Sequence, residues 1–175
     1  NLAKKYKISN LTLRPKKISN DNSQTIDVIK YELEKLEKEK SKTYDYILLL
    51  QPTTPFRDLN LFKKAFKVLK NSKEYDSVIT VNLVTNHHPY RMKIFNGKLI
   101  KNFMNFKKES FKAVKKLPKV YIRSGSMYLF KTNNIEKHAS ILGKKTYGLE
   151  VSGKYALNID EKEDLVITRY FFSKH

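Results

Sequence analysis

The sequence predicts an α/β fold with three layers, in which helices cover both faces of a mainly parallel sheet. Apolar segments of strand length alternate with segments whose apolar residues recur every three or four positions, as in amphipathic helices. The segment 46–50 is almost wholly apolar, which is typical of a central strand covered on both faces. The 175 residues suffice for one domain with a core of its own.

The first part of the chain holds one clear helix. Its apolar face lies within residues 26–39, and Thr25 is a candidate N-cap. Before this helix, residues 1–9 have the spacing of a helix end, and 11–13 has the composition of a short strand. Residues 16–25 form a polar loop.

The middle of the chain continues the alternation and then departs from it. A helix is predicted over residues 58–71, with Asp58 at its N-terminus, followed by a buried strand over 77–81. The turn signal Asn96-Gly97 then predicts a hairpin within residues 90–109. We expect this hairpin to belong to an inserted arm at about 85–125 in an otherwise single domain.

The last third returns to strands and ends with a helix. Strands are predicted over 121–130 and 146–151, and a closing helix over 161–173. The chain contains no internal repeat and no low-complexity linker.

The composition narrows the function classes. The net charge is +19, but the lysines are scattered among Asn, Ile and Tyr, so we interpret the charge as compositional bias and do not expect a nucleic-acid site. The chain has no cysteine, which excludes disulfides and thiolate metal sites. No apolar run has the length of about 20 residues that a membrane span needs. We expect a cytoplasmic protein.

Arginine is rare in this lysine-rich chain. Only five of the 36 basic residues are arginine. A guanidinium binds carboxylate or phosphate in a bidentate geometry that lysine cannot reproduce, so each retained arginine is a candidate for such a contact. The five are Arg14, Arg57, Arg91, Arg123 and Arg169.

The loop 51–57 is the first candidate for a binding site. It follows an apolar strand, contains two prolines, two threonines and Gln51, and leads into a helix. In α/β sheets ligands bind outside the carboxyl ends of the strands, where such loops lie. We expect Arg57 to brace this loop.

Five segments in order give the chain a resemblance to a known family. The segment 49–57 is similar to the LLQPTSPLR signature of the acylneuraminate cytidylyltransferases, which load acidic nine-carbon sugars such as sialic, legionaminic or pseudaminic acid onto CMP. The other similar segments are Leu13–Pro15 with Ser19–Asp21, His87–Pro89, Leu117–Pro118 with Tyr121–Tyr128, and Leu157–Leu165.

The resemblance implies a fold, a reaction and partners. The fold would be a three-layer, Rossmann-like nucleotidyltransferase with a small antiparallel dimerisation arm. The reaction would transfer CMP from CTP to an acidic nine-carbon sugar, with Mg²⁺ as cofactor and pyrophosphate as leaving group. The protein would be a homodimer without membrane contact. The alternatives are a sugar nucleotidyltransferase of the deoxy-octulosonate type, or a non-catalytic α/β remnant that binds a partner or nucleic acid through its basic surface.

On the nucleotide side, the resemblance assigns a catalytic and nucleotide-binding role to Arg14. A guanidinium suits triphosphate oxygens. Asp21, Ser23 and Thr25 would contact the nucleotide from the loop that follows. The residues by themselves also allow turn and capping roles for all four.

On the sugar side, the resemblance assigns contacts to Gln51, Arg91 and Tyr128. The family arginine just before the Leu-Pro pair is replaced here, and Lys115 or Lys116 would supply a point charge in its place. We interpret the pair His87-His88 as shaping the loop by hydrogen bonds, because adjacent histidines rarely ligate one ion.

Asp160 is the strongest candidate for chemistry. In the family two aspartates that are separated by one residue hold magnesium. In this chain the first position is Asn158 and the second is Asp160. Magnesium takes one or two carboxylates plus substrate phosphate oxygens, and an amide oxygen adds no charge. The alternative for Asp160 is a capping box with Glu163 at the start of the last helix.

Two features depart from the family. The family asparagine of the NGAIY segment is Ser124 here. The family also begins with a strand and a glycine-containing phosphate loop, to which no segment of this chain is similar. We therefore expect this chain to be a fragment with weak or no activity.

Overall fold

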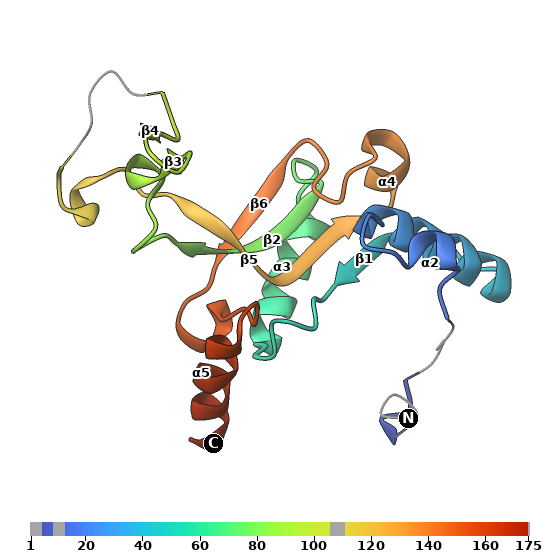
Figure 1. The fold of residues 1–175 in the computed structure, drawn as a ribbon. Helices are drawn as coiled ribbons and strands as arrows, with labels where there is room; N and C mark the ends of the chain where they lie inside the picture. Colours follow the sequence, from blue (N-terminus) through green and yellow to red (C-terminus); the bar gives the residue numbers. More distant parts are fainter. Residues whose placement is uncertain (1–4, 9–12, 106–110, 175) are drawn as a thin grey trace.

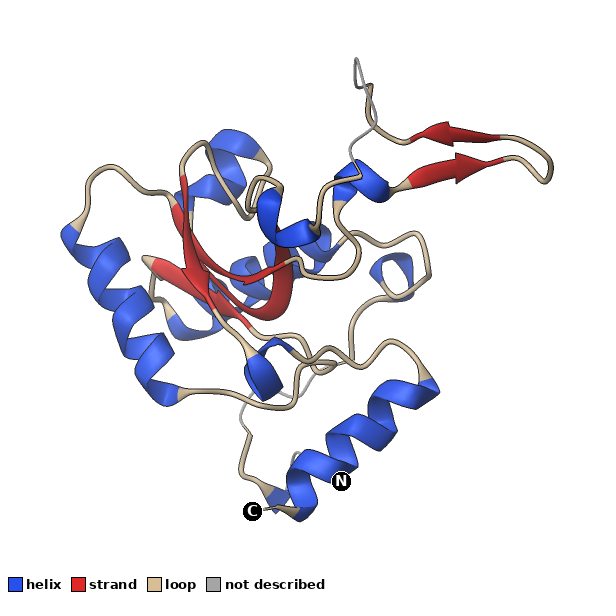
Figure 2. Ribbon diagram, turned by 90° about the vertical axis from the view of Figure 1, so that its left-hand side faces the viewer, coloured by secondary structure: helices blue, strands red, loops and turns tan. Residues whose placement is uncertain are grey.

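The computed structural model describes residues 5–8, 13–105 and 111–174. It contains a four-stranded sheet flanked by helices and a two-stranded ribbon that projects from one end (Figures 1 and 2). The strands are β1 (Tyr46–Leu49), β2 (Ser77–Leu83), β3 (Lys93–Phe95), β4 (Ile100–Asn102), β5 (Tyr121–Lys131) and β6 (Thr146–Glu150). The α-helices are α2 (Thr25–Lys40), α3 (Leu59–Asn71), α4 (Asn133–His138) and α5 (Lys162–Ser173). Short 3-10 helices are η1 (Lys16–Ile18), η2 (Pro89–Arg91), η3 (Val114–Lys116) and η4 (Gly153–Ala156).

The main sheet confirms the predicted mainly parallel arrangement. Its order is β1-β5-β2-β6. β5 is antiparallel to both of its neighbours, and β2 is parallel to β6, so β1, β2 and β6 all run in one direction. Only β5 runs against them.

Two apolar clusters confirm the three layers. On one face, Ala65 and Leu69 of α3 pack against Val78, Met127 and Leu129 of the sheet. On the other face, α2 and α4 cover the sheet around the buried ring of Phe130. Figure 1 shows α3 and α2 on opposite sides of the strands.

The helix starts agree with the sequence only in part. Asp58 caps α3, because its side chain accepts a hydrogen bond from the N–H of Asn60 at 2.9 Å. The prediction for Thr25 is wrong: α2 begins at Thr25, and Gln24 occupies the N-cap position without a capping side chain. The short α4 was not predicted, since six residues show too little periodicity.

The prediction that residues 46–50 form a central strand is also wrong. Among the described strands β1 lies at the edge of the sheet and pairs only with β5. Leu48 and Leu50 are 36% and 37% exposed. An apolar run indicates that helices cover the faces of a strand. It does not indicate whether neighbouring strands pair with both of its edges.

The predicted hairpin is confirmed as the ribbon β3–β4. Gly97 has φ +92°, and the side-chain oxygen of Asn96 accepts hydrogen bonds from the N–H groups of Lys98 and Leu99. The ribbon extends away from the sheet in Figure 2. The segments predicted over 1–9 and 11–13 fall mainly outside the described residues. In the described part of the chain, no helix has the length and apolar character to cross a membrane.

Candidate functional site

A polar cleft of about 380 Å³ lies where the strands that run in one direction end. The loop after β1 forms one wall, the C-terminal end of β2 and residues 122–128 of β5 form the floor, and the segment after β6 forms the other wall. This is the edge of the sheet at which α/β folds bind ligands. The lining residues are Gln51, Asn82, Ile122, Arg123, Ser124, Gly125, Tyr128, Ala156, Asn158 and Asp160.

Arg57 holds the Gln51 loop against β5. Its guanidinium donates hydrogen bonds to the backbone oxygens of Gln51 and Ser126, which belong to two separate segments. Burial of the guanidinium lowers the pKa of Arg57 from its ordinary value. The buried Thr54 hydroxyl donates to the same oxygen of Gln51 at 3.0 Å. The predicted bracing role of Arg57 is therefore confirmed.

A bulge in β5 makes room for the side chain of Gln51. The pairing of β2 with β5 shifts between Ile79 and Val81, and Gly125 in the irregular stretch has φ +77°. A Cβ atom on Gly125 would stand 2.5 Å from Oε1 of Gln51. Bulges redirect side chains next to functional sites, and only glycine adopts this backbone region without strain.

Thr80 stabilises the bulge from the opposite strand. Its hydroxyl accepts hydrogen bonds from the N–H of Met127 at 3.0 Å and from the hydroxyl of Ser126 at 3.2 Å. All three groups are buried. These two hydrogen bonds pair buried polar atoms of the irregular stretch within the protein.

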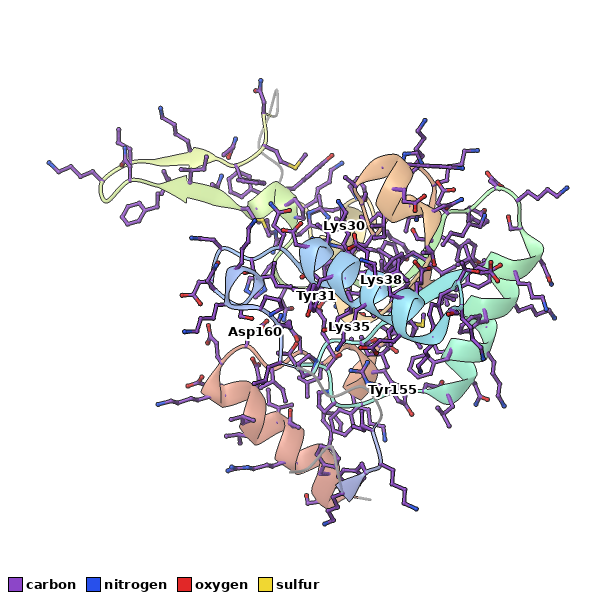
Figure 3. All side chains as sticks on the ribbon, turned by 90° about the vertical axis from the view of Figure 1, so that its right-hand side faces the viewer. Lys30, Tyr31, Lys35, Lys38, Tyr155 and Asp160 are labelled. Carbon is purple, nitrogen blue, oxygen red and sulfur yellow. The ribbon has the colours of Figure 1, made fainter. Side chains whose placement is uncertain are left out.

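The opposite wall carries the candidate metal pair. The amide of Asn158 donates a hydrogen bond to Oδ2 of Asp160. The N–H of Ile159 donates to the oxygen of Thr53 at 2.8 Å, which ties this wall to the Gln51 loop. In Figure 3 Asp160 lies between α2 above and α5 below in the view.

The side chain of Asp160 does not cap α5. The capping box consists of Glu161 and Asp164, so the predicted pair of Asp160 with Glu163 is wrong by one residue. Asp164 accepts hydrogen bonds from the N–H groups of Glu161 and Asp160, which lower the pKa of Asp164. The carboxylate of Asp160 is exposed in the cleft, where the amide of Asn158 is its hydrogen-bond partner.

The donor set at Asp160 fits a magnesium ion that also binds substrate phosphates. No cluster of three or more His, Cys or acidic side chains suited to a metal occurs among the described residues. Magnesium needs only one or two protein carboxylates when phosphate oxygens and water supply the rest. Oδ1 of Asn158 is buried and lacks a hydrogen-bond partner in the described structure. A half-turn of this amide exchanges its two ends, so Asn158 can present its oxygen beside Asp160.

The predicted nucleotide-side residues lie outside this cleft. Arg14, Asp21, Ser23 and Thr25 belong to the exposed segment that leads into α2, and none of them lines the cleft. Ser23 is used in a local turn, in which its hydroxyl contacts the N–H of Asn20 at 3.1 Å. Their predicted roles stay predictions.

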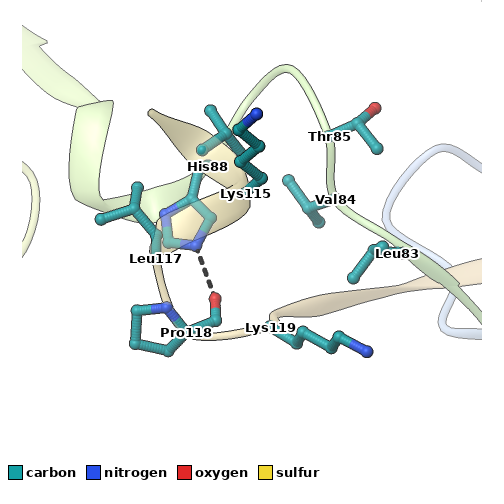
Figure 4. A pocket seen from close by; sticks show the side chains of 9 residues that line it. Leu83, Val84, Thr85, His88, Lys115, Leu117, Pro118 and Lys119 are labelled. Carbon is teal, nitrogen blue, oxygen red and sulfur yellow. Dashed lines mark hydrogen bonds between the residues drawn. The ribbon is translucent and has the colours of Figure 1, made fainter. Parts of the chain in front are cut away.

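Arg91 and Lys115 also stand apart from the cleft. The guanidinium of Arg91 donates to the oxygen of Lys112 at 2.9 Å. Lys115 lines a separate hollow of about 350 Å³ beside His88 (Figure 4). His88 is buried, contacts the oxygen of Pro118 through Nε2 at 2.9 Å, and accepts the N–H of Tyr90 at Nδ1. It shapes the loop by hydrogen bonds, as predicted.

Of the predicted site residues, the structure brings Gln51, Tyr128, Asn158 and Asp160 together. The sequence reasoning did not assign Arg123 or Asn82 to the site, although both line the cleft. Arg123 was noted as one of the rare arginines, and that rarity was the available signal. Asn82 gave none, because a single asparagine near a strand end is common.

Two known proteins are similar to this chain in sequence. Over 153 residues the chain is 30% identical to the "Pseudaminic acid cytidylyltransferase and UDP-2,4-diacetamido-2,4,6-trideoxy-beta-L-altropyranose hydrolase" of Helicobacter pylori, covering 87% of this chain and 28% of that protein. Over 157 residues it is 22% identical to the "Post-translational flagellin modification protein B" of Campylobacter coli, covering 90% of this chain and 65% of that protein. The chain thus spans less than two thirds of either relative. The particular acidic sugar stays a prediction.

No protein-family profile matches the chain. A solved structure of 4-diphosphocytidyl-2C-methyl-D-erythritol synthase from Anaerococcus prevotii resembles it with a TM-score of 0.47 and 17% identity, over 84% of this chain and 76% of that one. A likeness of this size carries no functional argument.

Proposed function

We propose that the protein is a cytidylyltransferase that transfers CMP from CTP to an acidic nine-carbon sugar and releases pyrophosphate. In this reaction the anomeric hydroxyl oxygen of the sugar bonds to the α-phosphorus of CTP. The bond from that phosphorus to the bridging oxygen of the β-phosphate breaks, and the hydroxyl proton passes to solvent. The protein contributes positioning and electrostatic stabilisation.

One observation carries the proposal: the carboxylate of Asp160 faces a polar cleft at the carboxyl ends of the strands, although the adjacent helix has a complete capping box without it. A carboxylate that is not needed for helix stability is suited to hold a cation. The 30% identity to a protein named as a pseudaminic acid cytidylyltransferase supports the same reaction class.

The cleft residues divide into two groups. Gln51 offers amide donors and an acceptor for hydroxyl or acylamino groups, and Tyr128 also lines this side, so we assign it to the sugar. Asp160 and Asn158 on the other wall would hold Mg²⁺. When bound, the ion screens the triphosphate and polarises the α-phosphate.

The edge of β1 supports an active unit that includes a further strand and a phosphate loop. An apolar groove of about 410 Å³ lies between α2 and β1, lined by Ile29, Leu33, Ile47 and Leu49 among others. An unpaired edge beside an apolar groove is a surface that proteins usually cover. We propose that the nucleotide-side roles of Arg14, Asp21, Ser23 and Thr25 depend on such a segment.

The ribbon β3–β4 supports the proposed homodimer. Phe95, Leu99, Ile100 and Phe103 are each more than 60% exposed, which is unusual for a projecting hairpin in water. Sedimentation should give the mass of a dimer, and replacing Phe95 and Ile100 with serine should give a monomer. A monomeric wild-type protein at micromolar concentration would contradict the dimer.

The experiment that tests the reaction is the release of pyrophosphate. Two forms of the protein are assayed: the chain alone, and the chain joined to a family-like phosphate loop segment. Each form receives Mg²⁺, CTP and one of three sugars, namely pseudaminic, legionaminic or N-acetylneuraminic acid. Asp160→Ala should abolish the magnesium-dependent rate, while Glu163→Ala, which changes a neighbouring carboxylate outside the capping box, should leave it unchanged.

Failure to release pyrophosphate from CTP with any of these sugars in both forms of the protein would refute the reaction. Activity with a deoxy-octulosonate acid alone would favour the neighbouring nucleotidyltransferase. Salt-sensitive binding to random DNA, without thermal stabilisation by CTP, would favour the non-catalytic alternative.

A further inference from the structure

Arg123 lies in the cleft, and its charge takes part in no structural contact among the described residues. Among the described residues that line the cleft it is the only cation. Within the described part of the chain, its guanidinium makes no hydrogen bond or ion pair, and in particular none with Asp160 on the opposite wall. An arginine in a lysine-rich chain that is not used for structure is a candidate for ligand contact.

The bulge in β5 determines where this arginine points. Tyr128 pairs with Ile79, and Arg123 pairs with Val81. Residues five apart on a regular strand point to opposite faces, but Ile79 and Val81, two apart on β2, share one face. Since paired residues project to the same side of a sheet, the bulge at Gly125 brings Arg123 to the face of Tyr128.

The surroundings of Arg123 are those of a sugar site. Gln51 contributes an uncharged amide to this part of the cleft, and Tyr128 lines it from the same face of β5 as Arg123. Amides bind hydroxyl and acylamino groups through both donors and an acceptor. A guanidinium in the same cleft adds one bidentate site for a planar anion.

We propose that Arg123 binds the carboxylate of the acceptor sugar and so selects acidic over neutral sugars. The inference rests on the proposed function, because it takes the cleft as the acceptor site. It differs from the expectation based on resemblance, which gave a sugar contact to Arg91 and no role to Arg123. The guanidinium of Arg91 instead donates to the oxygen of Lys112, outside the cleft of its own chain.

The test measures equilibrium binding by calorimetry, without the need for turnover. The probes are N-acetylneuraminic acid, pseudaminic acid and the methyl ester of each, which keeps the shape and removes the charge. The proteins are wild type, Arg123→Gln, Arg123→Lys and the matched control Arg169→Gln, whose arginine is exposed on α5.

We expect the wild type to prefer an acid over its ester by about tenfold, as for one charge-assisted contact near solvent. Arg123→Gln should lose this preference, Arg123→Lys should keep part of it, and Arg169→Gln should match the wild type. Affinity for CTP should be the same in all four proteins.

Three results would overturn the proposal: a wild type without preference for the acid, an Arg123→Gln variant that keeps the preference, or a variant that loses CTP affinity instead. The last result would assign Arg123 to phosphate. If acids bind through Arg123 but no pyrophosphate is released, the cytidylyltransferase proposal fails and this inference stands. If pyrophosphate is released and the Michaelis constant for the sugar is unchanged in Arg123→Gln, only this inference fails.

Discussion

Removal of the Arg57 guanidinium should destabilise the fold and loosen the sugar side of the cleft. This group joins the backbone oxygens of Gln51 and Ser126, and Ser126 is only 4% exposed. A second, longer link joins the same loop to β5, since the hydroxyl of Thr54 also contacts the oxygen of Gly125 at 3.4 Å. The side chain therefore acts as a clamp between two segments that are distant in sequence.

The magnitude follows from the two hydrogen bonds. Each bond from a charged donor contributes about 1.5–3 kcal/mol, and the partial burial of the charge offsets some of this. We expect Arg57→Ala to lower the free energy of unfolding by about 2–4 kcal/mol. The oxygen of Gln51 keeps the N–H and hydroxyl of Thr54, whereas the backbone oxygen of Ser126 loses the guanidinium. Lysine can reach one oxygen but not both, so Arg57→Lys should lose about half as much.

Urea denaturation of wild type, Arg57→Ala, Arg57→Lys and Arg169→Ala measures the effect. The exposed Arg169 on α5 serves as the matched control, and its loss should change stability by less than about 0.5 kcal/mol. Arg57→Ala should also weaken the binding of an acidic sugar, because the Gln51 loop is no longer held. If Arg57→Ala and Arg169→Ala are equally stable, the clamp has no energetic role and the reasoning is refuted.

Two further predictions concern Gly125 and Asp76. Gly125→Ala should cost about 1–2 kcal/mol through its left-handed backbone and should weaken acidic-sugar binding by displacing the amide of Gln51. The control is Gly153→Ala, because Gly153 has φ +56° and open space where a Cβ would stand. It should lower stability by a similar amount and leave sugar binding unchanged. Equal sugar binding by the two variants would contradict the displacement of Gln51. The N–H groups of Lys145 and Lys144 hold the pKa of the Asp76 carboxyl below its ordinary value of 3.8. The stabilisation by the ionised carboxyl is present above pH 3.8 and is lost as the pH falls through the lower pKa of the folded state. Urea denaturation at pH 7 should therefore show Asp76→Asn less stable than wild type, by less than about 1 kcal/mol after solvent screening. A stability difference that does not shrink toward pH 2 would contradict this role of Asp76.

The local features of this protein were largely predictable. The positions of β5, β6, α3 and the ribbon match the sequence predictions to within a few residues, because apolar period, N-cap and turn residues act over short distances. The Gln51 loop was identified as a site for the same reason: it follows an apolar strand and begins a helix. The N-cap predictions at Thr25 and Asp160 are each wrong by one residue, because several consecutive polar residues there are able to cap a helix.

The predictions that failed or were missing depend on contacts between distant segments. The apolar run of β1 did not reveal that β5 separates it from β2 and leaves it at the edge. Nor does any local pattern show that Arg57 reaches Ser126, or that Arg123 turns toward Tyr128. Those outcomes require the pairing of β2 with β5.

The sequence by itself determined the α/β class, the binding loop around Gln51 and the candidate carboxylate at Asp160, because each is written in neighbouring residues. Only the tertiary structure decided which of these groups share a cleft. The alignment of β5 against β2, with its bulge at Gly125, brings Gln51, Arg123 and Tyr128 to one place. The hydrogen bond from the N–H of Ile159 to the oxygen of Thr53 then brings Asp160 to the opposite wall of the cleft. Register and side-chain direction are properties of paired strands, and a single strand does not encode them.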